Sequence, residues 1–63
     1  MRNWLKNKRE LKGLTHEQVS SLSGCSRAFY ILIENGNRRP IPKLAKRIAR
    51  VLEFDWTLFY EDR

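Results

Sequence analysis

The sequence predicts an all-α fold of five short helices, and three observations support this. Apolar residues recur at helical spacing, a glycine stands where each of the first three helical segments should stop, and no stretch alternates polar and apolar residues as a strand does. At 63 residues the chain is predicted to be a single domain spanning 1–63. One cysteine and one histidine supply neither a disulfide nor a zinc site, so no cofactor or metal is expected and helix packing must provide stability.

The first helix is predicted over residues 2–11. Trp4, Leu5 and Leu11 are expected to face inward, and the lysines between them to face water. Gly13 follows the segment, and glycine adopts the left-handed conformation at a helix C-terminus without steric cost.

The second helix has a clear start. Thr15 is a candidate N-cap, and Gln18 follows at the spacing of a capping box. Val19 and Leu22 are expected to face the core, and Gly24 ends the segment.

The third helix is predicted over 27–35, with Ser26 as its cap and Gly36 as its stop. Only about four residues, 23–26, separate it from the second helix. A link this short containing a glycine forces a sharp angle between the helices, which is helix-turn-helix geometry.

The fourth helix is predicted to begin with Pro42 in its first turn, where a missing N–H costs nothing. Its buried stripe comprises Leu44, Ile48, Val51 and Leu52. A final short helix is expected to begin at Asp55, a good N-cap, and to carry Trp56, Leu58 and Phe59.

Charge is unevenly distributed along the chain. The net charge is +6, yet residues 1–50 carry twelve basic and three acidic residues, whereas 51–63 carry four acidic and one basic. A basic body suits a polyanion such as nucleic acid, and the alternative is a basic surface that only favours solubility. With neither a membrane-length apolar run nor a secretory signal, a cytoplasmic protein associated with the nucleoid is expected.

In this order and spacing, the residues resemble the helix-turn-helix of phage repressors and Cro proteins, the XRE family. The match covers nearly the whole chain: Arg9, 13–15, 18–19, 23–27, 33–36, 38–40, then Leu44, 48–49, 51–52 and 55–59. The resemblance implies a compact, lambda repressor-like bundle of five short helices, with the third helix in the DNA major groove. It further implies a sequence-specific transcriptional regulator of bacterial or phage type, a repressor that binds a double-stranded operator.

The resemblance also assigns roles to individual residues. Arg27 and Ala28, at the start of the third helix, are expected to contact bases, although Arg27 has a phosphate contact as its alternative. Arg9 and Glu34 are expected to form a structural ion pair. Contacts with the DNA backbone are expected from Thr15, His16, Ser26, Arg38, Arg39 and Lys43. For His16 and the arginine loop the alternative is simple exposure to solvent.

The third helix departs from the family pattern, because Phe29 to Ile33 form an unbroken apolar run. One face cannot bury all five side chains, and Ile31 and Leu32 stand where the family usually has polar residues. One hypothesis is that Ile31 and Leu32 contact thymine methyl groups. The alternative is that they bind another protein, which would make the chain a small interaction module of antirepressor or antitoxin type.

Catalysis is not expected, because the chain has no phosphate loop, no metal set and no nucleophile–base arrangement, and no small-molecule ligand is evident. Specific binding by so small a domain usually needs two half-sites, which implies a homodimer at least on DNA. The aromatic residues at the C-terminal end could form a dimer surface, but Trp56 and Phe59 are expected to complete the core. Cys25 is expected to be a buried thiol.

Overall fold

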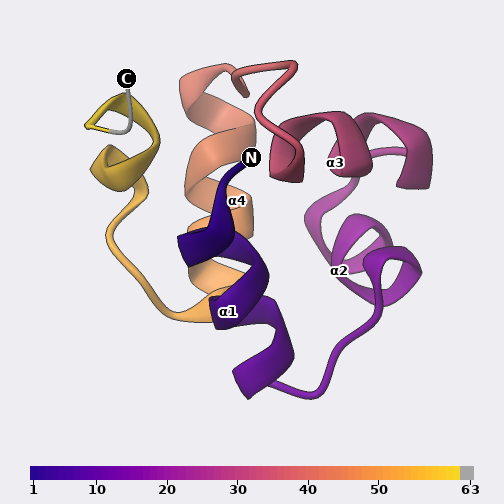
Figure 1. Cartoon of the computed structure of the whole chain (residues 1–63). Coiled ribbons are helices and arrows are strands. Elements are labelled where there is room, and N and C mark those ends of the chain that lie inside the picture. Colours follow the sequence, from indigo (N-terminus) through magenta and orange to yellow (C-terminus); the bar gives the residue numbers. More distant parts are fainter. Residues whose placement is uncertain (62–63) are drawn as a thin grey trace.

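The computed structural model describes residues 1–61, and its helices are shown in Figure 1. The described part contains no strand. It has four α-helices, rather than the five expected, and one 3-10 helix: α1 (Asn3–Leu11), α2 (His16–Ser23), α3 (Arg27–Glu34), α4 (Pro42–Leu52) and η1 (Trp56–Tyr60). The last element is only five residues long, and 3-10 helices occur in short segments of this kind. Within residues 1–61, no helix is long and apolar enough to cross a membrane.

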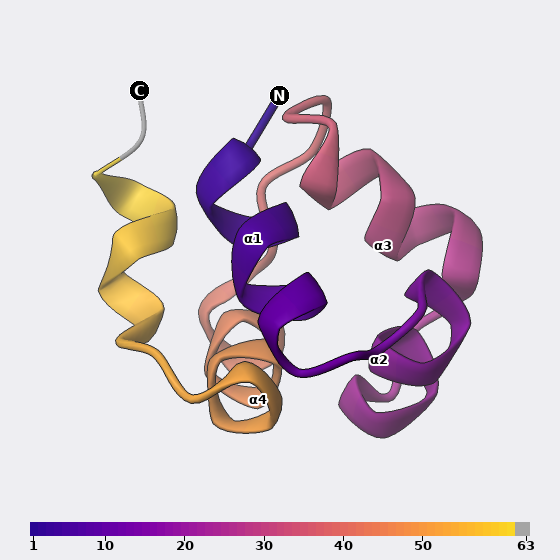
Figure 2. The same cartoon turned by 60° about the horizontal axis from the view of Figure 1, so that its bottom comes forward.

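The helices surround one core, with α1 and α4 in the middle. Figures 1 and 2 show α2 and α3 on one side of this pair and η1 on the other. α2 packs against both α3 and α4, and α4 also packs against η1. The resulting body measures 25 × 21 × 20 Å along its principal axes.

The helix starts follow the local signals in the sequence. Thr15 and Gln18 form the predicted capping box, in which each side chain accepts a hydrogen bond from the other residue's backbone N–H. Ser26 caps α3 and Asp55 caps η1, each by accepting a backbone N–H, and Pro42 lies in the first turn of α4. These contacts satisfy amides that a helix N-terminus otherwise leaves unpaired.

The core is apolar and contains residues from all five helices. Phe59 of η1 is fully buried, and its ring meets those of Trp4 and Phe54 edge-on at centroid distances of 5.2 and 5.6 Å. The other fully or almost fully buried apolar residues of the core are Leu5, Val19, Tyr30, Ile33, Ala45, Ile48 and Leu52.

Two leucines expected in the core are on the surface. Leu11 is 84% exposed and Leu22 is 65% exposed. In α1 the buried positions are Leu5 and Arg9, four residues apart, and the advance of about 100° per residue places Leu11 on the far side. In α2 the serines at positions 20 and 23 face inward with Val19, because small side chains allow close contact with α4.

Candidate nucleic-acid interface

The link between α2 and α3 is a three-residue turn, 24–26. Gly24 has a φ of +79°, and the N–H groups of Gly24 and Cys25 donate to the carbonyls of Ser21 and Ser20. A Cβ at Gly24 would lie 3.3 Å from the Arg47 guanidinium, so both the conformation and the space favour glycine there. Cys25, expected to be buried, is half-buried, and this burial raises the pKa of its thiol.

The surface of α3 divides into two faces. Tyr30, Ile33 and Glu34 are buried against the bundle. Of the four residues predicted to contact bases, Arg27, Ala28 and Leu32 are exposed, while Ile31 is half-buried. Ile31 and Leu32 are the two apolar residues that depart from the family pattern. Leu32 is the more accessible of them, with 37% of its surface exposed.

The residues predicted to contact the DNA backbone differ in whether their side chains already make contacts within the protein. Arg38 and Lys43 are exposed, and Arg39 is exposed with its guanidinium 5.5 Å from the centre of the Tyr60 ring. The hydroxyls of Thr15 and Ser26 accept hydrogen bonds from the backbone of their own helices. Each can still approach a phosphate as part of a helix N-terminus.

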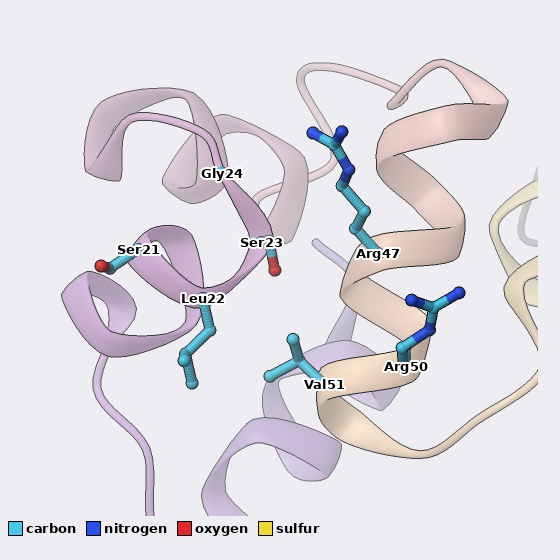
Figure 3. Close-up of a pocket in the computed structure, with 7 residues that line it drawn as sticks. All are labelled: Ser21, Leu22, Ser23, Gly24, Arg47, Arg50 and Val51. Atoms are coloured by element: carbon cyan, nitrogen blue, oxygen red, sulfur yellow. The ribbon is translucent and has the colours of Figure 1, made fainter.

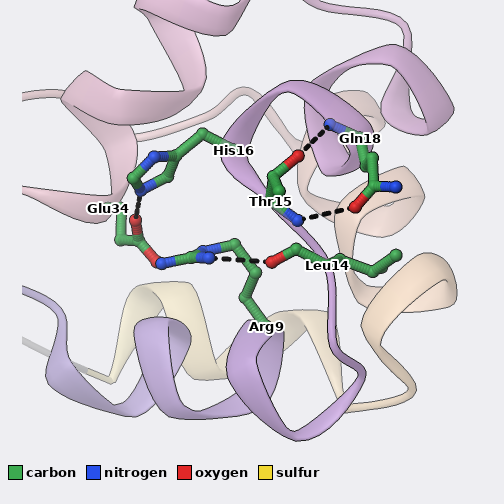
Figure 4. A network of polar contacts seen from close by, with 6 residues as sticks. All are labelled: Arg9, Leu14, Thr15, His16, Gln18 and Glu34. Carbon is green, nitrogen blue, oxygen red and sulfur yellow. Dashed lines mark hydrogen bonds and ion pairs between the residues drawn. The ribbon is translucent and has the colours of Figure 1, made fainter.

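A buried polar network joins α1, α2 and α3 (Figure 4). Arg9 Nε donates to Glu34 Oε1 at 3.0 Å, and Arg9 Nη1 donates to the Leu14 carbonyl at 2.8 Å. The Glu34 side chain is only 2% exposed. The pair therefore ties the end of α3 to α1 and to the segment that leads into α2.

His16 joins this network, a contact that was not expected from the sequence. Its Nε2 lies 2.5 Å from Glu34 Oε2, and its side chain is about one-third exposed. A contact between His16 and a phosphate stays a prediction, and it would have to share the ring with Glu34. Positions 16 and 34 are far apart in sequence, so no local pattern signals their contact.

The Tyr30 hydroxyl is buried beside the same network. Within residues 1–61 it has no hydrogen-bond partner of good geometry. Burial raises the pKa of Tyr30 far above its usual value, and the nearby Glu34 carboxylate raises it further. The folded protein therefore keeps Tyr30 protonated in alkaline solution.

We expect Tyr30 to make the domain less stable at high pH. Above about pH 10 the unfolded chain loses the tyrosine proton while the folded chain retains it, which favours unfolding by up to about 1.4 kcal/mol per pH unit. Urea unfolding of the wild type and Tyr30→Phe at about pH 8, 10 and 11 measures this effect. The stability of the wild type relative to Tyr30→Phe should fall above about pH 10, and parallel curves would contradict the assignment.

Arg2 is the main functional candidate that was not identified from the sequence. It was expected to start the first helix, but it is the residue before that helix and is only 7% exposed. Its Nη1 donates to the carbonyls of Ile33 and Arg38 at 2.5 and 2.8 Å. The spacing of Arg2, Leu5 and Arg9 places them on one helical face, a signal that could have indicated an inward arginine.

A groove lies between the end of α2 and the C-terminal half of α4 (Figure 3). It has a volume of about 300 Å³, and Arg47 and Arg50 form no ion pair within residues 1–61. The buried Ser23 hydroxyl beside it lacks a hydrogen-bond partner in the same part of the chain. The two arginines of the groove add positive charge next to the turn before α3. Residues 1–61 contain no group of three His, Cys, Asp or Glu side chains placed to hold a metal ion. The groove is lined by Ser21, Leu22, Ser23, Gly24, Arg47, Arg50 and Val51.

Comparison with known proteins adds to this geometry. Residues 5–59 match a family model described as helix-turn-helix. The chain is 48% identical over 62 residues to YqaF, an uncharacterized HTH-type transcriptional regulator of Bacillus subtilis, covering 98% of this chain and 82% of YqaF. It is 39% identical over 64 residues to MJ0272, an uncharacterized HTH-type transcriptional regulator of Methanocaldococcus jannaschii, covering 98% and 97%. No solved structure matches the chain significantly.

Proposed function

The chain belongs to the XRE-type helix-turn-helix family, and from this we propose that it is a sequence-specific transcriptional regulator that binds double-stranded DNA. One observation carries the proposal furthest. The first turn of α3 presents exposed Arg27 and Ala28, and the loop after α3 presents exposed Arg38 and Arg39. In DNA the major groove lies between two phosphate backbones. A helix that contacts bases in the groove, flanked by cationic side chains that contact the phosphates, is complementary to that arrangement.

In the proposed complex, α3 enters the major groove and its exposed side chains read base edges. The Arg27 guanidinium can donate two hydrogen bonds to guanine O6 and N7. Ala28 and Leu32 would contact thymine methyl groups, with a smaller contribution from half-buried Ile31. Arg38, Arg39 and Lys43 would bind phosphates, which sets the register of the domain without reading sequence.

Repression is the simplest consequence of such binding, because a protein bound to an operator blocks the access of RNA polymerase to the promoter. We propose that two copies bind two half-sites about one helical turn apart, since one domain reads only a few base pairs. The operator would then be a short palindrome.

Selection of binding sites from random duplexes, followed by a salt titration on the best site, tests the proposal. We expect an enriched motif and an affinity that falls steeply with salt, because phosphate contacts release bound cations. Absence of a motif, together with absent or salt-insensitive binding, would contradict DNA binding. That result would favour the alternative in which Leu32 and its neighbours bind a protein.

We expect Arg27→Ala and Leu32→Ala to change which bases are preferred. Arg27→Ala should weaken binding by about 1–3 kcal/mol and relax the preference for one guanine, because alanine cannot form the bidentate hydrogen bonds. Leu32→Ala should relax the preference for one thymine. Leu11→Ala is a matched control, because Leu11 is exposed on α1 rather than on α3. Repeating the site selection with each variant measures these effects, and unchanged preferences at every position would contradict base reading by these side chains.

A further inference from the structure

The loop between α3 and α4 is held in place from both ends of the chain. We propose that Arg2 and Tyr60 are positioning residues, which fix this loop so that Arg38 and Arg39 meet the DNA backbone. The inference rests on the proposed function, because it explains how the phosphate-binding residues are presented.

Arg2 holds the loop from the N-terminal end. Its backbone N–H donates to the Glu34 carbonyl at 2.8 Å, and its Nη1 donates to the carbonyls of Ile33 and Arg38 at 2.5 and 2.8 Å. One buried guanidinium thus bridges the last turn of α3 and the loop. The carbonyls at a helix C-terminus lack partners within the helix and carry partial negative charge, so a cation there is favourable.

Tyr60 holds the loop from the C-terminal end. Its hydroxyl donates to the Pro40 carbonyl at 3.0 Å, and the Arg39 guanidinium lies over its ring, 5.5 Å from the centre. The Trp56 ring packs edge-on against Tyr60 at 5.6 Å and supports it. A guanidinium that stacks on a ring keeps its N–H edge free, so Arg39 can be oriented by Tyr60 and still bind a phosphate.

Further contacts hold the backbone inside the loop. The N–H groups of Asn37 and Arg38 both donate to the Leu32 carbonyl, at 2.9 and 3.2 Å, after Gly36 turns the chain with a φ of +84°. A Cβ at Gly36 would lie 3.4 Å from the Met1 nitrogen, so the chain start packs directly on this turn.

Holding the loop in advance should raise affinity without any new contact with DNA. Ordering a free backbone costs conformational entropy, and a loop that is already ordered avoids that cost on binding. Releasing the loop should therefore weaken binding and remove phosphate contacts, even though Arg2 and Tyr60 touch no DNA.

Three variants separate the contributions of these side chains. Arg2→Lys keeps the charge, but its side chain is one bond shorter, so its Nζ is drawn back from the position where Arg2 Nη1 meets both carbonyls. Tyr60→Phe removes only the hydroxyl, and Tyr60→Leu also removes the ring. Leu11→Ala, at an exposed position of α1, is the control. Affinity for the selected operator is measured from about 50 to 300 mM salt, at a temperature where circular dichroism shows each variant folded.

We expect Arg2→Lys and Tyr60→Leu to weaken operator binding about three- to tenfold, with a smaller reduction for Tyr60→Phe. The slope of log affinity against log salt should become shallower by about 0.9 for each phosphate that is no longer bound. Reduced stability alone would lower the folded fraction and leave that slope unchanged. Arg39→Gln should also cost less affinity in the Tyr60→Leu protein than in the wild type, because the two side chains act together.

Two outcomes are distinguishable. If the wild type shows no salt-dependent binding to any selected duplex, the proposed function fails. If the wild type binds but the folded Arg2 and Tyr60 variants keep its affinity and salt slope, or the Arg39 and Tyr60 effects simply add, the positioning role is overturned and the proposed function stands. Should Arg2→Lys not fold, the Tyr60 variants and the Arg39 cycle still decide the question.

Discussion

Glu34→Ala is expected to destabilise the protein by about 3–5 kcal/mol. Arg9 is only 9% exposed, and the variant removes the carboxylate that neutralises its charge. Removing one partner of a buried ion pair costs about 3–5 kcal/mol, because the other charge is left buried and unpaired. A chain of this length has a total stability of about 3–9 kcal/mol, so the loss is at least about a third of the total. Urea unfolding followed by far-ultraviolet circular dichroism measures the destabilisation.

Two further variants make this result interpretable. Glu10→Ala removes an exposed glutamate from α1 and should change stability by less than about 0.5 kcal/mol. Arg9→Met combined with Glu34→Leu removes both charges and should recover much of the stability, because no buried charge is left uncompensated. If Glu34→Ala were as stable as Glu10→Ala, the network in Figure 4 would not stabilise the packing of α3 against α1 and α2.

Phe59→Ala is expected to be comparably severe, although it changes a five-residue 3-10 helix close to the C-terminal end. Phe59 is fully buried and meets the rings of Trp4 and Phe54, so its removal leaves a cavity in the core. Truncating a buried phenylalanine to alanine costs about 3–5 kcal/mol. Thermal and urea unfolding should both show this destabilisation.

Leu11→Ala provides the contrasting case for Phe59. Leu11 is the last residue of α1, it is 84% exposed, and its truncation should cost less than about 0.5 kcal/mol. A large destabilisation by Leu11→Ala, or a small one by Phe59→Ala, would mean that the core is not arranged as described.

The limits of the helices followed from the sequence because they depend on local contacts. A capping side chain reaches only about two or three residues along the chain, so Thr15, Ser26 and Asp55 could be identified from their immediate neighbours. The final segment is a 3-10 helix rather than an α-helix, and five residues give too short a pattern to distinguish the two helix types.

Which side chains face inward was harder to predict, because polar residues occupy part of the core. Arg2 and Arg9 lie on the buried face of α1, and an interpretation based on apolar periodicity assigns that face to leucines instead. In α2 two serines occupy inward positions, whereas apolar periodicity assigned an inward position to Leu22. A charged or polar side chain is buried only where distant groups satisfy it, and those groups are not visible in a local pattern.

The candidate site shows the same division. Arg27, Ala28 and the loop arginines are exposed, and their contacts with DNA stay a prediction. The contacts of Arg2 and Tyr60 with the loop join residues 20 to 36 positions apart, so they became apparent only in the folded arrangement.

The small size of the body has a consequence for how sharply such a regulator can respond. Its longest dimension is 25 Å, whereas equivalent faces of successive major grooves are about 34 Å apart. The body is shorter than that separation, so on the proposed operator each half-site would be filled by its own molecule. Occupancy would then rise with roughly the square of monomer concentration, so that a modest change in the amount of protein switches the promoter.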